Sequence, residues 1–389
     1  MIKRSIQPYL LKLAKMYPVV SVTGPRQSGK TTLIKNAFPR YEYLNLEDER
    51  IRTFAKSDPI EFLKSFDRPI IIDEAQYVPE IFSAVQVISD EDESCGRFIL
   101  SGSQNFLLLK NISQSLAGRV GILKLLPLSF SEIHEHEKNI DNKNFMIEGS
   151  YPRIYNSHIP QKQFYQDYIL TYINRDVKNL LDVRNVQDFE RLLKLLAANS
   201  GQLVNYTNLS KNLGIDIKTV KSWMSILVSS YICYLLPPYY ANIKKRLVKS
   251  SKIYFMDTGL LCYLLNVNNT KQYEQSEFKG HIFENFVIEQ LLKKHYSMNE
   301  NPTLSFYRDN DKNEVDLIDE TGTSDYKMFE IKSSSLYSKE HKKVLLKISN
   351  LLNVSIDECC VINGGNLSFK DEGLKVFSFY DWATNKWQN

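Results

Sequence analysis

The sequence has little cysteine, and its cysteines show no pairing pattern. None of the five forms a CxxC pair, and none combines with histidine at the spacing of a zinc site. We therefore expect reduced thiols, as in a cytoplasmic protein, and no disulfide framework. The five are Cys95, Cys233, Cys262, Cys359 and Cys360.

Long apolar runs are also missing. The longest, ILVSSYICYLLPPYY at 226–240, is too short for a membrane span and ends in two prolines. Near the N-terminus, Lys12 and Lys15 interrupt the apolar core that a signal peptide would need. We expect a cytoplasmic protein without a membrane-spanning segment.

The chain has no strong excess of either charge. Its 49 basic and 45 acidic residues leave a net charge of +4, which is too small to indicate a nucleic-acid partner. The 24% of charged and 43% of hydrophobic residues argue against global disorder. A length of 389 residues predicts two or three domains.

A glycine-rich segment near the N-terminus, GPRQSGKTT at 24–32, matches the phosphate-binding pattern G-x-x-x-x-G-K-[ST]. It follows a β-branched run at 18–24 and opens a helical segment at 31–38, the context that this pattern requires. Backbone N–H groups of such a loop bind phosphates, and the helix N-terminus adds partial positive charge. Lys30 is predicted to reach the β and γ phosphates of ATP, and Thr31 to bind Mg²⁺. The predicted nucleotide contacts are Gly24, Pro25, Arg26, Gln27, Ser28, Gly29, Lys30, Thr31 and Thr32.

A pair of acids follows a second apolar run, RPIIIDEAQ at 68–76. Such a run predicts a buried parallel strand, whose carboxyl end lies where these sheets bind ligands. Asp73 is predicted to hold Mg²⁺, and Glu74 to polarise the water that attacks ATP. Two motifs in this order make a chance glycine turn a poor explanation.

Three further strands are expected, at 41–47, 96–103 and 121–130. A strand between the two motifs, with a glutamate after Asp73, resembles the additional-strand P-loop ATPases, which include the AAA group. In that group a polar residue after the 96–103 strand senses the γ-phosphate. The resemblance implies Ser103 or Gln104 for this role, and a serine-rich turn is the alternative.

Arg119 precedes the last predicted strand in the segment AGR at 117–119. One interpretation is a contact with a nucleotide phosphate, in its own subunit or in a neighbouring copy. The other is a structural salt bridge. A homo-oligomer or a protein partner is therefore an open possibility.

The middle of the chain predicts a helical linker at 136–186, followed by a winged-helix pattern at 187–262. The pattern consists of three helices and then two strands around a basic loop. We expect this loop either to bind DNA phosphates or to belong to a domain used for protein contacts. Lysines on the third helix are further candidates. The basic residues are Lys218, Lys221, Lys244, Lys245, Arg246, Lys249 and Lys252.

The C-terminal part has carboxylates in a recognisable order. Glu284 shares a helix face with apolar residues, Asp316 lies in a predicted strand, and Glu330 and Lys332 lie two apart on another strand. This order resembles the restriction-endonuclease-like, PD-(D/E)XK, core. The resemblance implies Mg²⁺ bound by Glu284, Asp316 and Glu330, with Asp316, Glu330 and Lys332 in catalysis. A scaffold in which these residues pair structurally is the alternative.

The order of segments is similar to one prokaryotic family of AAA-type ATPases whose C-terminal half is a domain of unknown function. The segments are GPRQSGKTT, NLED, IIIDEAQ, LSGSQ, AGR, LPLSFSE, EGSYPRIY and YINRDV. The resemblance covers nearly the whole chain and implies ATP and Mg²⁺ as ligands.

The sequence thus predicts an α/β protein. A P-loop NTPase domain with a parallel sheet is expected at 1–135, a helical linker at 136–186, a winged helix at 187–262 and a nuclease-like α/β domain at 263–389. The predicted function is ATP hydrolysis coupled to a DNA-binding, nuclease-like region. The alternative is a nucleotide-gated switch or adaptor in which that region only binds.

Overall fold

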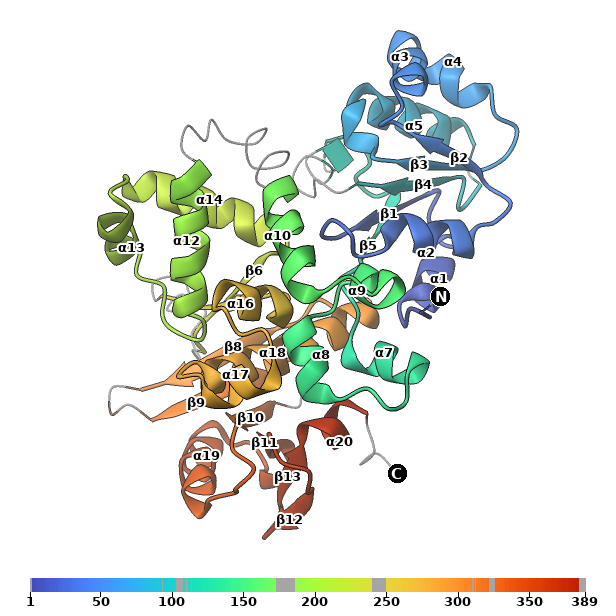
Figure 1. Cartoon of the computed structure of the whole chain (residues 1–389). Helices are drawn as coiled ribbons and strands as arrows, with labels where there is room; N and C mark the ends of the chain where they lie inside the picture. The colour runs from blue at the N-terminus through green and yellow to red at the C-terminus, as the bar shows by residue number, and fades with distance from the viewer. Residues whose placement is uncertain are drawn as a thin grey trace. The chain divides into compact units, whose positions relative to one another are not determined.

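The computed structural model describes residues 2–92, 94–102, 108, 111–112, 114–172, 186–239, 250–309, 311, 313–321 and 326–384. The chain forms two compact units. The first unit holds residues 1–128 with two short later segments, 229–231 and 296–299, and the second holds the remainder. Figure 1 gives the order of the elements. None of the described helices combines the length and hydropathy that crossing a bilayer requires.

The first unit is built on a five-stranded parallel sheet with the order β2-β3-β4-β1-β5. The strand between the two nucleotide motifs lies beside β3, at the edge of the sheet. The predicted parallel P-loop sheet is therefore confirmed. Its strands are β1 (Val19–Thr23), β2 (Glu42–Asn45), β3 (Ile70–Asp73), β4 (Phe98–Ser101) and β5 (Val120–Lys124).

Helices supply apolar side chains to both faces of this sheet. Alternate strand residues serve the two faces, so that Ile70 and Ile72 join one cluster and Ile71 joins the other. The first cluster takes side chains from α3, α4 and α5, and the second takes them from α1 and α2. These helices are α1 (Gln7–Leu13), α2 (Lys30–Ala37), α3 (Glu49–Ser57), α4 (Pro59–Lys64) and α5 (Glu80–Glu91), with the short η1 (Ala75–Tyr77) after β3.

The second unit begins with a series of helices. Ser129 starts the first of them with a capping box formed with Glu132, as the S-x-x-E spacing predicts. The helices are α7 (Phe130–His136), α8 (Asn142–Glu148), α9 (Pro152–Ser157) and α10 (Gln161–Tyr172).

Three helices and a two-stranded antiparallel sheet follow, close to the predicted positions. Gly214 ends the second helix with a positive φ of 70°, a conformation that glycine adopts without strain. Leu203, before that helix, forms a β-bridge with Lys252. The elements are α12 (Val186–Ala198), α13 (Tyr206–Leu213), α14 (Ile217–Ser229), β6 (Cys233–Leu236) and β7 (Lys252–Phe255), followed by α16 (Thr258–Leu264) and α17 (Thr270–Gln275).

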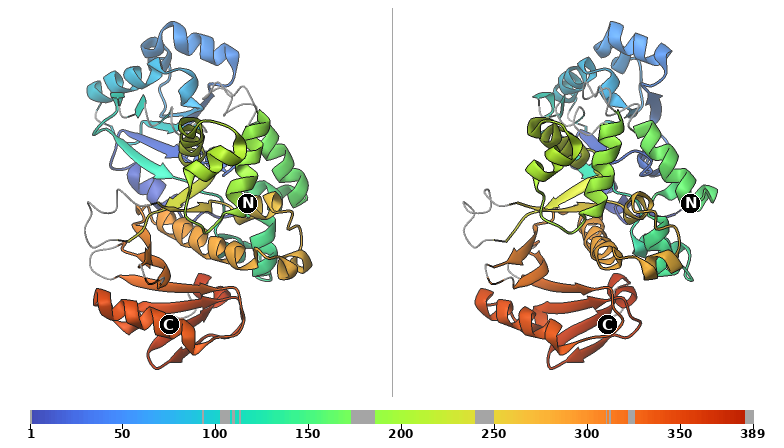
Figure 2. Two further views of the ribbon diagram at one scale, coloured as in Figure 1. Left: turned by 90° about the vertical axis from the view of Figure 1, so that its left-hand side faces the viewer. Right: turned by 60° about the vertical axis from the view of Figure 1, so that its left-hand side comes forward.

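The C-terminal part is a six-stranded mixed sheet with the order β12-β13-β11-β10-β9-β8. Strands β8, β9 and β10 are antiparallel, whereas β10, β11 and β13 are parallel. Helix α19 packs on β9, β10 and β11 through Leu345 and Ile348, and Figure 2 shows this sheet and its helix in the orange and red segments. The elements are α18 (Lys279–Ser297), β8 (Leu304–Arg308), β9 (Glu314–Asp319), β10 (Lys327–Lys332), α19 (Lys339–Leu352), η3 (Ile356–Glu358), β11 (Cys359–Asn363), β12 (Phe369–Asp371), β13 (Leu374–Ser378) and α20 (Phe379–Ala383).

Candidate functional site

The glycine-rich loop lies between β1 and α2, and its two glycines are required by the backbone. Gly24 has a φ of +146°, and a Cβ there would lie 2.1 Å from the carbonyl oxygen of Leu125. Gly29 has a φ of +93° at the start of α2, where no side chain caps the helix. The first N–H groups of α2 are therefore available to an anion such as a phosphate.

Two polar side chains of the loop fit a phosphate ligand. Lys30 is buried, and its Nζ donates to the carbonyl oxygens of Gly24 at 3.0 Å and Pro25 at 2.8 Å. Its ammonium group is therefore held within the loop itself. The buried Oγ of Ser28 has no hydrogen-bond partner among the described residues. An unpartnered buried hydroxyl is costly, and a bound phosphate oxygen would satisfy it.

The Asp73 carboxylate at the end of β3 is the centre of a small polar network. Thr31 Oγ1 donates to Asp73 Oδ2 at 2.7 Å, and Ser101 Oγ donates to Oδ1 at 2.5 Å. The backbone N–H of Glu74 also donates to Oδ1, at 3.1 Å. A hydroxyl and a carboxylate, the oxygen ligands that Mg²⁺ takes, are therefore in direct contact, so these residues fit the ion.

Tyr43 on β2 is a member of this network that the sequence motifs do not reveal. Its hydroxyl donates to Asp73 Oδ2 at 2.8 Å, and Lys35 Nζ lies 3.4 Å from the centre of its ring. Burial and the negative charge of Asp73 raise the pKa of Tyr43 well above its ordinary value. Tyr43 therefore stays protonated and a donor at neutral pH. The signal in the sequence was its place on the strand between the two motifs.

Glu74 is held by a neighbour that lies within the same sequence motif. Gln76 Nε2 donates to Glu74 Oε2 at 2.5 Å. The Gln76 side chain also packs against Gly102, where a Cβ would lie 2.2 Å from Gln76 Oε1. Gln76 thereby connects the catalytic candidate Glu74 to the end of β4, and reasoning from the acidic pair alone did not identify it.

Arg4, near the N-terminus, supports the glycine-rich loop through hydrogen bonds to backbone carbonyl groups. Its guanidinium donates to the carbonyl oxygens of Ser28 at 2.8 Å and Leu126 at 2.6 Å, and the residue is buried. It therefore ties the glycine-rich loop to the segment that follows β5. No motif marks Arg4, and its basic neighbour Lys3 carries the same charge.

Three predicted site residues of the first unit remain, namely Ser103, Gln104 and Arg119. Ser103 and Gln104 lie outside the described residues. Arg119 precedes β5 at the amino edge of the parallel sheet, whereas the glycine-rich loop and Asp73 follow strand carboxyl ends. Its guanidinium pairs with Asp90, with Nε at 2.5 Å from Oδ1. Of the two interpretations of Arg119, the structural salt bridge is therefore the one that this contact favours.

In the second unit the structure brings three of the four C-terminal candidates together. Lys332 Nζ lies 2.6 Å from Glu330 Oε1 and 3.5 Å from Asp316 Oδ2. Asp316 Oδ2 also accepts from the N–H of Ile331 at 2.8 Å. The other carboxylate oxygen of Glu330, Oε2, is buried and has no hydrogen-bond partner within the described part of the chain. Burial, with the nearby charge of Asp316, raises the pKa of Glu330 to about 8 although Lys332 opposes the shift.

Glu284 on α18 has partners of its own. Its Oε1 accepts from the Tyr254 hydroxyl at 2.5 Å and lies 3.4 Å from Lys252 Nζ. Burial raises the pKa of Glu284 to about 7, with Lys252 opposing and Asp316 adding to the shift. No three His, Cys, Asp or Glu side chains of the described chain are arranged to hold a metal ion. Lysines pair with these carboxylates in the structure, and the metal site of Glu284, Asp316 and Glu330 stays a prediction.

The basic loop between β6 and β7 is mostly outside the described residues, including Lys244, Lys245, Arg246 and Lys249. Lys252, the last of this group, is described, and it is buried. The expectation that it faces DNA is wrong, since it pairs with Glu314 at 2.5 Å as well as with Glu284. Lys218 and Lys221 are exposed on α14.

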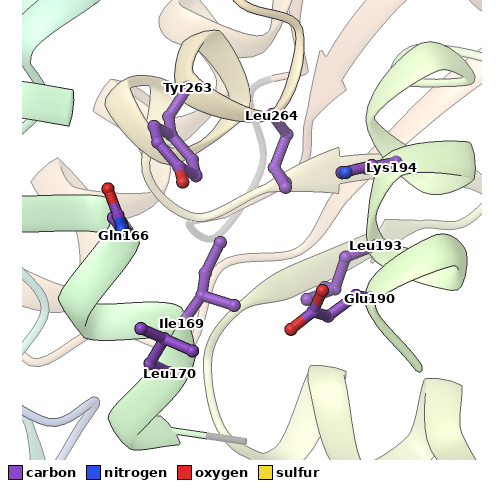
Figure 3. Close-up of a pocket in the computed structure, with 8 residues that line it drawn as sticks. All are labelled: Gln166, Ile169, Leu170, Glu190, Leu193, Lys194, Tyr263 and Leu264. Carbon is purple, nitrogen blue, oxygen red and sulfur yellow. The ribbon is translucent and has the colours of Figure 1, made fainter. Parts of the chain in front are cut away.

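A hollow of about 230 Å³ lies elsewhere in the second unit and contains none of the predicted residues. Figure 3 shows apolar side chains of α10, α12 and α16 around it, with Glu190 and Lys194 at its side. The lining residues are Gln166, Ile169, Leu170, Glu190, Leu193, Lys194, Tyr263 and Leu264.

The sheet order, the glycine-rich loop and the acidic pair together define a AAA-type P-loop ATPase domain. Comparison with known families agrees, because residues 16–134 match the AAA domain. Residues 139–271 match a domain of unknown function, DUF8612, and residues 279–382 match another, DUF4143.

The chain also has relatives over most of its length. It is 31% identical over 321 residues to the protein Rv2008c of Mycobacterium tuberculosis, covering 82% of this chain and 71% of the relative. To MJ1544 of Methanocaldococcus jannaschii it is 26% identical over 329 residues, covering 76% and 71%. The chain belongs to the same family as the mycobacterial protein, and within it residues 16–134 match the AAA domain. Among solved structures, the Walker-type ATPase PABY2304 of Pyrococcus abyssi matches with 14% identity and a TM-score of 0.46, over 68% of this chain and 96% of that one.

Proposed function

We propose that the first unit binds ATP with Mg²⁺ and hydrolyses it. The observation that carries this proposal is the contact between Thr31 Oγ1 and Asp73 Oδ2. It lies at the N-terminus of α2, which no side chain caps. Thr31 and Asp73 would hold the ion, which would neutralise charge on the β and γ phosphates. Lys30 would leave the loop carbonyls and bind the same phosphates.

The hydrolytic step is assigned to Glu74. Its carboxylate would accept a proton from the water that attacks the γ-phosphorus, while the hydrogen bond from Gln76 holds the carboxylate in one orientation. Tyr43 and Ser101 act on the other acid, since each donates a hydrogen bond to the Asp73 carboxylate and holds it in place.

We further propose that the second unit cleaves phosphodiester bonds of a nucleic acid. Support comes from the meeting of Asp316, Glu330 and Lys332 on adjacent strands and from the unpartnered, buried Oε2 of Glu330, which fits a cation ligand. A divalent ion bound by Asp316 and Glu330 would polarise the scissile phosphate. Lys332 would then orient the attacking water.

DNA is the favoured substrate because of the helices that precede this site. Helices α12, α13 and α14, the bridge at Leu203 and the strands β6 and β7 follow the order of a winged helix. Such folds place the third helix in the major groove. Lys218 and Lys221 are exposed on that helix and could bind phosphates.

A nucleotide-gated switch or adaptor is the second candidate function. It is favoured by the ion pairs of the C-terminal carboxylates, because Lys332 neutralises Asp316 and Glu330, and Lys252 neutralises Glu284. In this case the ATP state of the first unit would control binding by the second, without cleavage.

One experiment separates the two candidates. The protein is incubated with labelled single- and double-stranded DNA and RNA, in Mg²⁺ or Mn²⁺, with and without ATP. Lys332→Ala, Asp316→Asn and Lys30→Ala proteins run in parallel. Cleavage that is lost in the first two variants supports the nuclease, and its loss in Lys30→Ala would show that ATP controls it. ATP turnover without any cleavage would leave the switch.

A further inference from the structure

The C-terminal site contains a second lysine that does not come from the nuclease-like sheet. Lys252 is the first residue of β7, in the two-stranded sheet that precedes the site in the chain. It is only 3% exposed. Its Nζ lies 2.5 Å from Glu314 Oε1 and 3.4 Å from Glu284 Oε1, and it also lies over the ring of Phe306.

Acidic side chains from two different elements surround Lys252. Its ammonium pairs with the carboxylates of Glu284 and Glu314. A buried ammonium with acidic partners on α18 and β9 is a fixed positive charge inside the site. Tyr254, two residues further along β7, completes the contact by donating to Glu284.

The carboxylates of the site therefore differ in what they can still bind. Glu284 Oε1 is occupied by the ammonium of Lys252 and the hydroxyl of Tyr254. Glu330 is 8% exposed, and none of the described residues forms a hydrogen bond with its Oε2. Lys332, the other cation, is a third exposed at its side chain, so it can move toward solvent more readily than Lys252.

We infer that Lys252 is a built-in cation of the C-terminal site, which neutralises Glu284 and limits the site to one divalent ion held by Asp316 and Glu330. The inference rests on the proposed nuclease function and specifies its metal requirement. Positive charge close to a metal site weakens the binding of a further cation. The middle region, through β7, thus determines how many ions the C-terminal site accepts.

The test measures Mn²⁺ binding directly, by the electron paramagnetic resonance signal of free Mn²⁺ during titration of the full-length, nucleotide-free protein. Asp316→Asn identifies the ions bound at this site. Lys252→Met removes the charge and keeps the apolar stem, and Lys252→Arg keeps the charge as the matched control. Lys252→Gln serves as the second neutral variant if Lys252→Met does not fold, as judged by thermal unfolding.

We expect the wild type and Lys252→Arg to bind one Mn²⁺ that Asp316→Asn loses. Lys252→Met should bind that ion at least about tenfold more tightly, or bind a second ion, because a buried positive charge is gone. Equal or weaker binding in the neutral variant would overturn the role of Lys252 and leave the nuclease proposal intact. No ion sensitive to Asp316→Asn in any variant would instead overturn both.

Discussion

The hydroxyl of Thr31 lies 2.7 Å from the carboxylate of Asp73, although 42 residues separate them in the chain. Thr31 opens α2, and Asp73 ends β3. The contact exists because both elements reach the carboxyl edge of one parallel sheet, where ligands of such folds bind.

Replacing Lys30 should abolish ATP turnover. Lys30→Ala removes the ammonium that the loop holds beside the uncapped start of α2, and we expect at least a hundredfold loss of phosphate release. Lys64→Ala is the control, since its ion pair with Glu91 is exposed and distant from the loop in sequence. Full turnover in Lys30→Ala would mean that another site or a contaminant hydrolyses ATP.

Glu74 and Gln76 should affect hydrolysis more than binding. Glu74→Gln keeps the size of the side chain and removes the base, so ATP affinity should persist while kcat falls by about 10² or more. Gln76→Ala should reduce kcat less, because it frees the Glu74 carboxylate without removing it. Single-turnover rates and equilibrium nucleotide binding separate these effects. Lost binding in Glu74→Gln would assign Glu74 a structural role.

Arg4 should matter for stability and for nucleotide affinity together. Arg4→Ala breaks two buried hydrogen bonds from a charged group, to Ser28 O and Leu126 O, and should cost roughly 2–4 kcal/mol of unfolding free energy. Arg4→Lys should recover only part, since one ammonium replaces a planar fork. Lys3→Ala is the neighbouring control, and denaturant unfolding is the measurement. If both Ala variants behave alike, Arg4 does not support the loop.

Glu289 should give the second unit a pH-dependent stability. Burial raises the pKa of Glu289 to about 7 against the pull of Lys293, whereas an unfolded glutamate titrates near 4.5. Between these values the folded state binds more protons, so its unfolding free energy should fall as pH rises, on the order of 2–3 kcal/mol. Glu289→Gln removes the titrating group and should flatten the profile over this window. Unfolding curves from pH 4.5 to 8 test this, and equal slopes in both proteins would refute it.

The exposed lysines of α14 should contribute to DNA binding. Reversing both charges, Lys218→Glu with Lys221→Glu, should weaken binding to duplex DNA and lower the slope of affinity against salt. Lys271→Glu on α17 is an exposed control for the change in net charge. Fluorescence anisotropy at several salt concentrations is the measurement. An unchanged affinity and salt slope would leave the three-helix region as a connector.

Much of the architecture was predictable because it depends on local sequence patterns, such as glycine positions and the spacing of apolar residues. The glycine-rich loop can be recognised in the sequence because only glycine fits at position 24. Gly24 has a φ of +146°, and the backbone of Leu125 approaches it closely. The acidic pair can be recognised because it comes at the end of a short apolar run, and its first residue, Asp73, closes β3. The helices at α12 to α14 followed from apolar spacing and from Gly214 as a stop. The three boundaries between the four expected domains remain a prediction.

The positions that the sequence left open or misplaced depend on which segments meet. Arg119 had two interpretations, and the salt bridge is favoured because β5 is parallel to β1, so that its start lies at the sheet edge away from the loop. Lys252 looked like part of a solvated basic loop. It is instead the first residue of a strand, and its ammonium pairs with the carboxylates of Glu284 and Glu314.

By itself, the sequence determined the phosphate loop, the acidic pair and the order of helices and strands, because glycine conformation and hydrophobic periodicity are local properties of the chain. Only the tertiary structure decided that Tyr43, Ser101 and Arg4 support the nucleotide site, and that Lys252 neutralises Glu284. These contacts join residues far apart in sequence, and the energy that fixes them comes from burying charged and polar groups together.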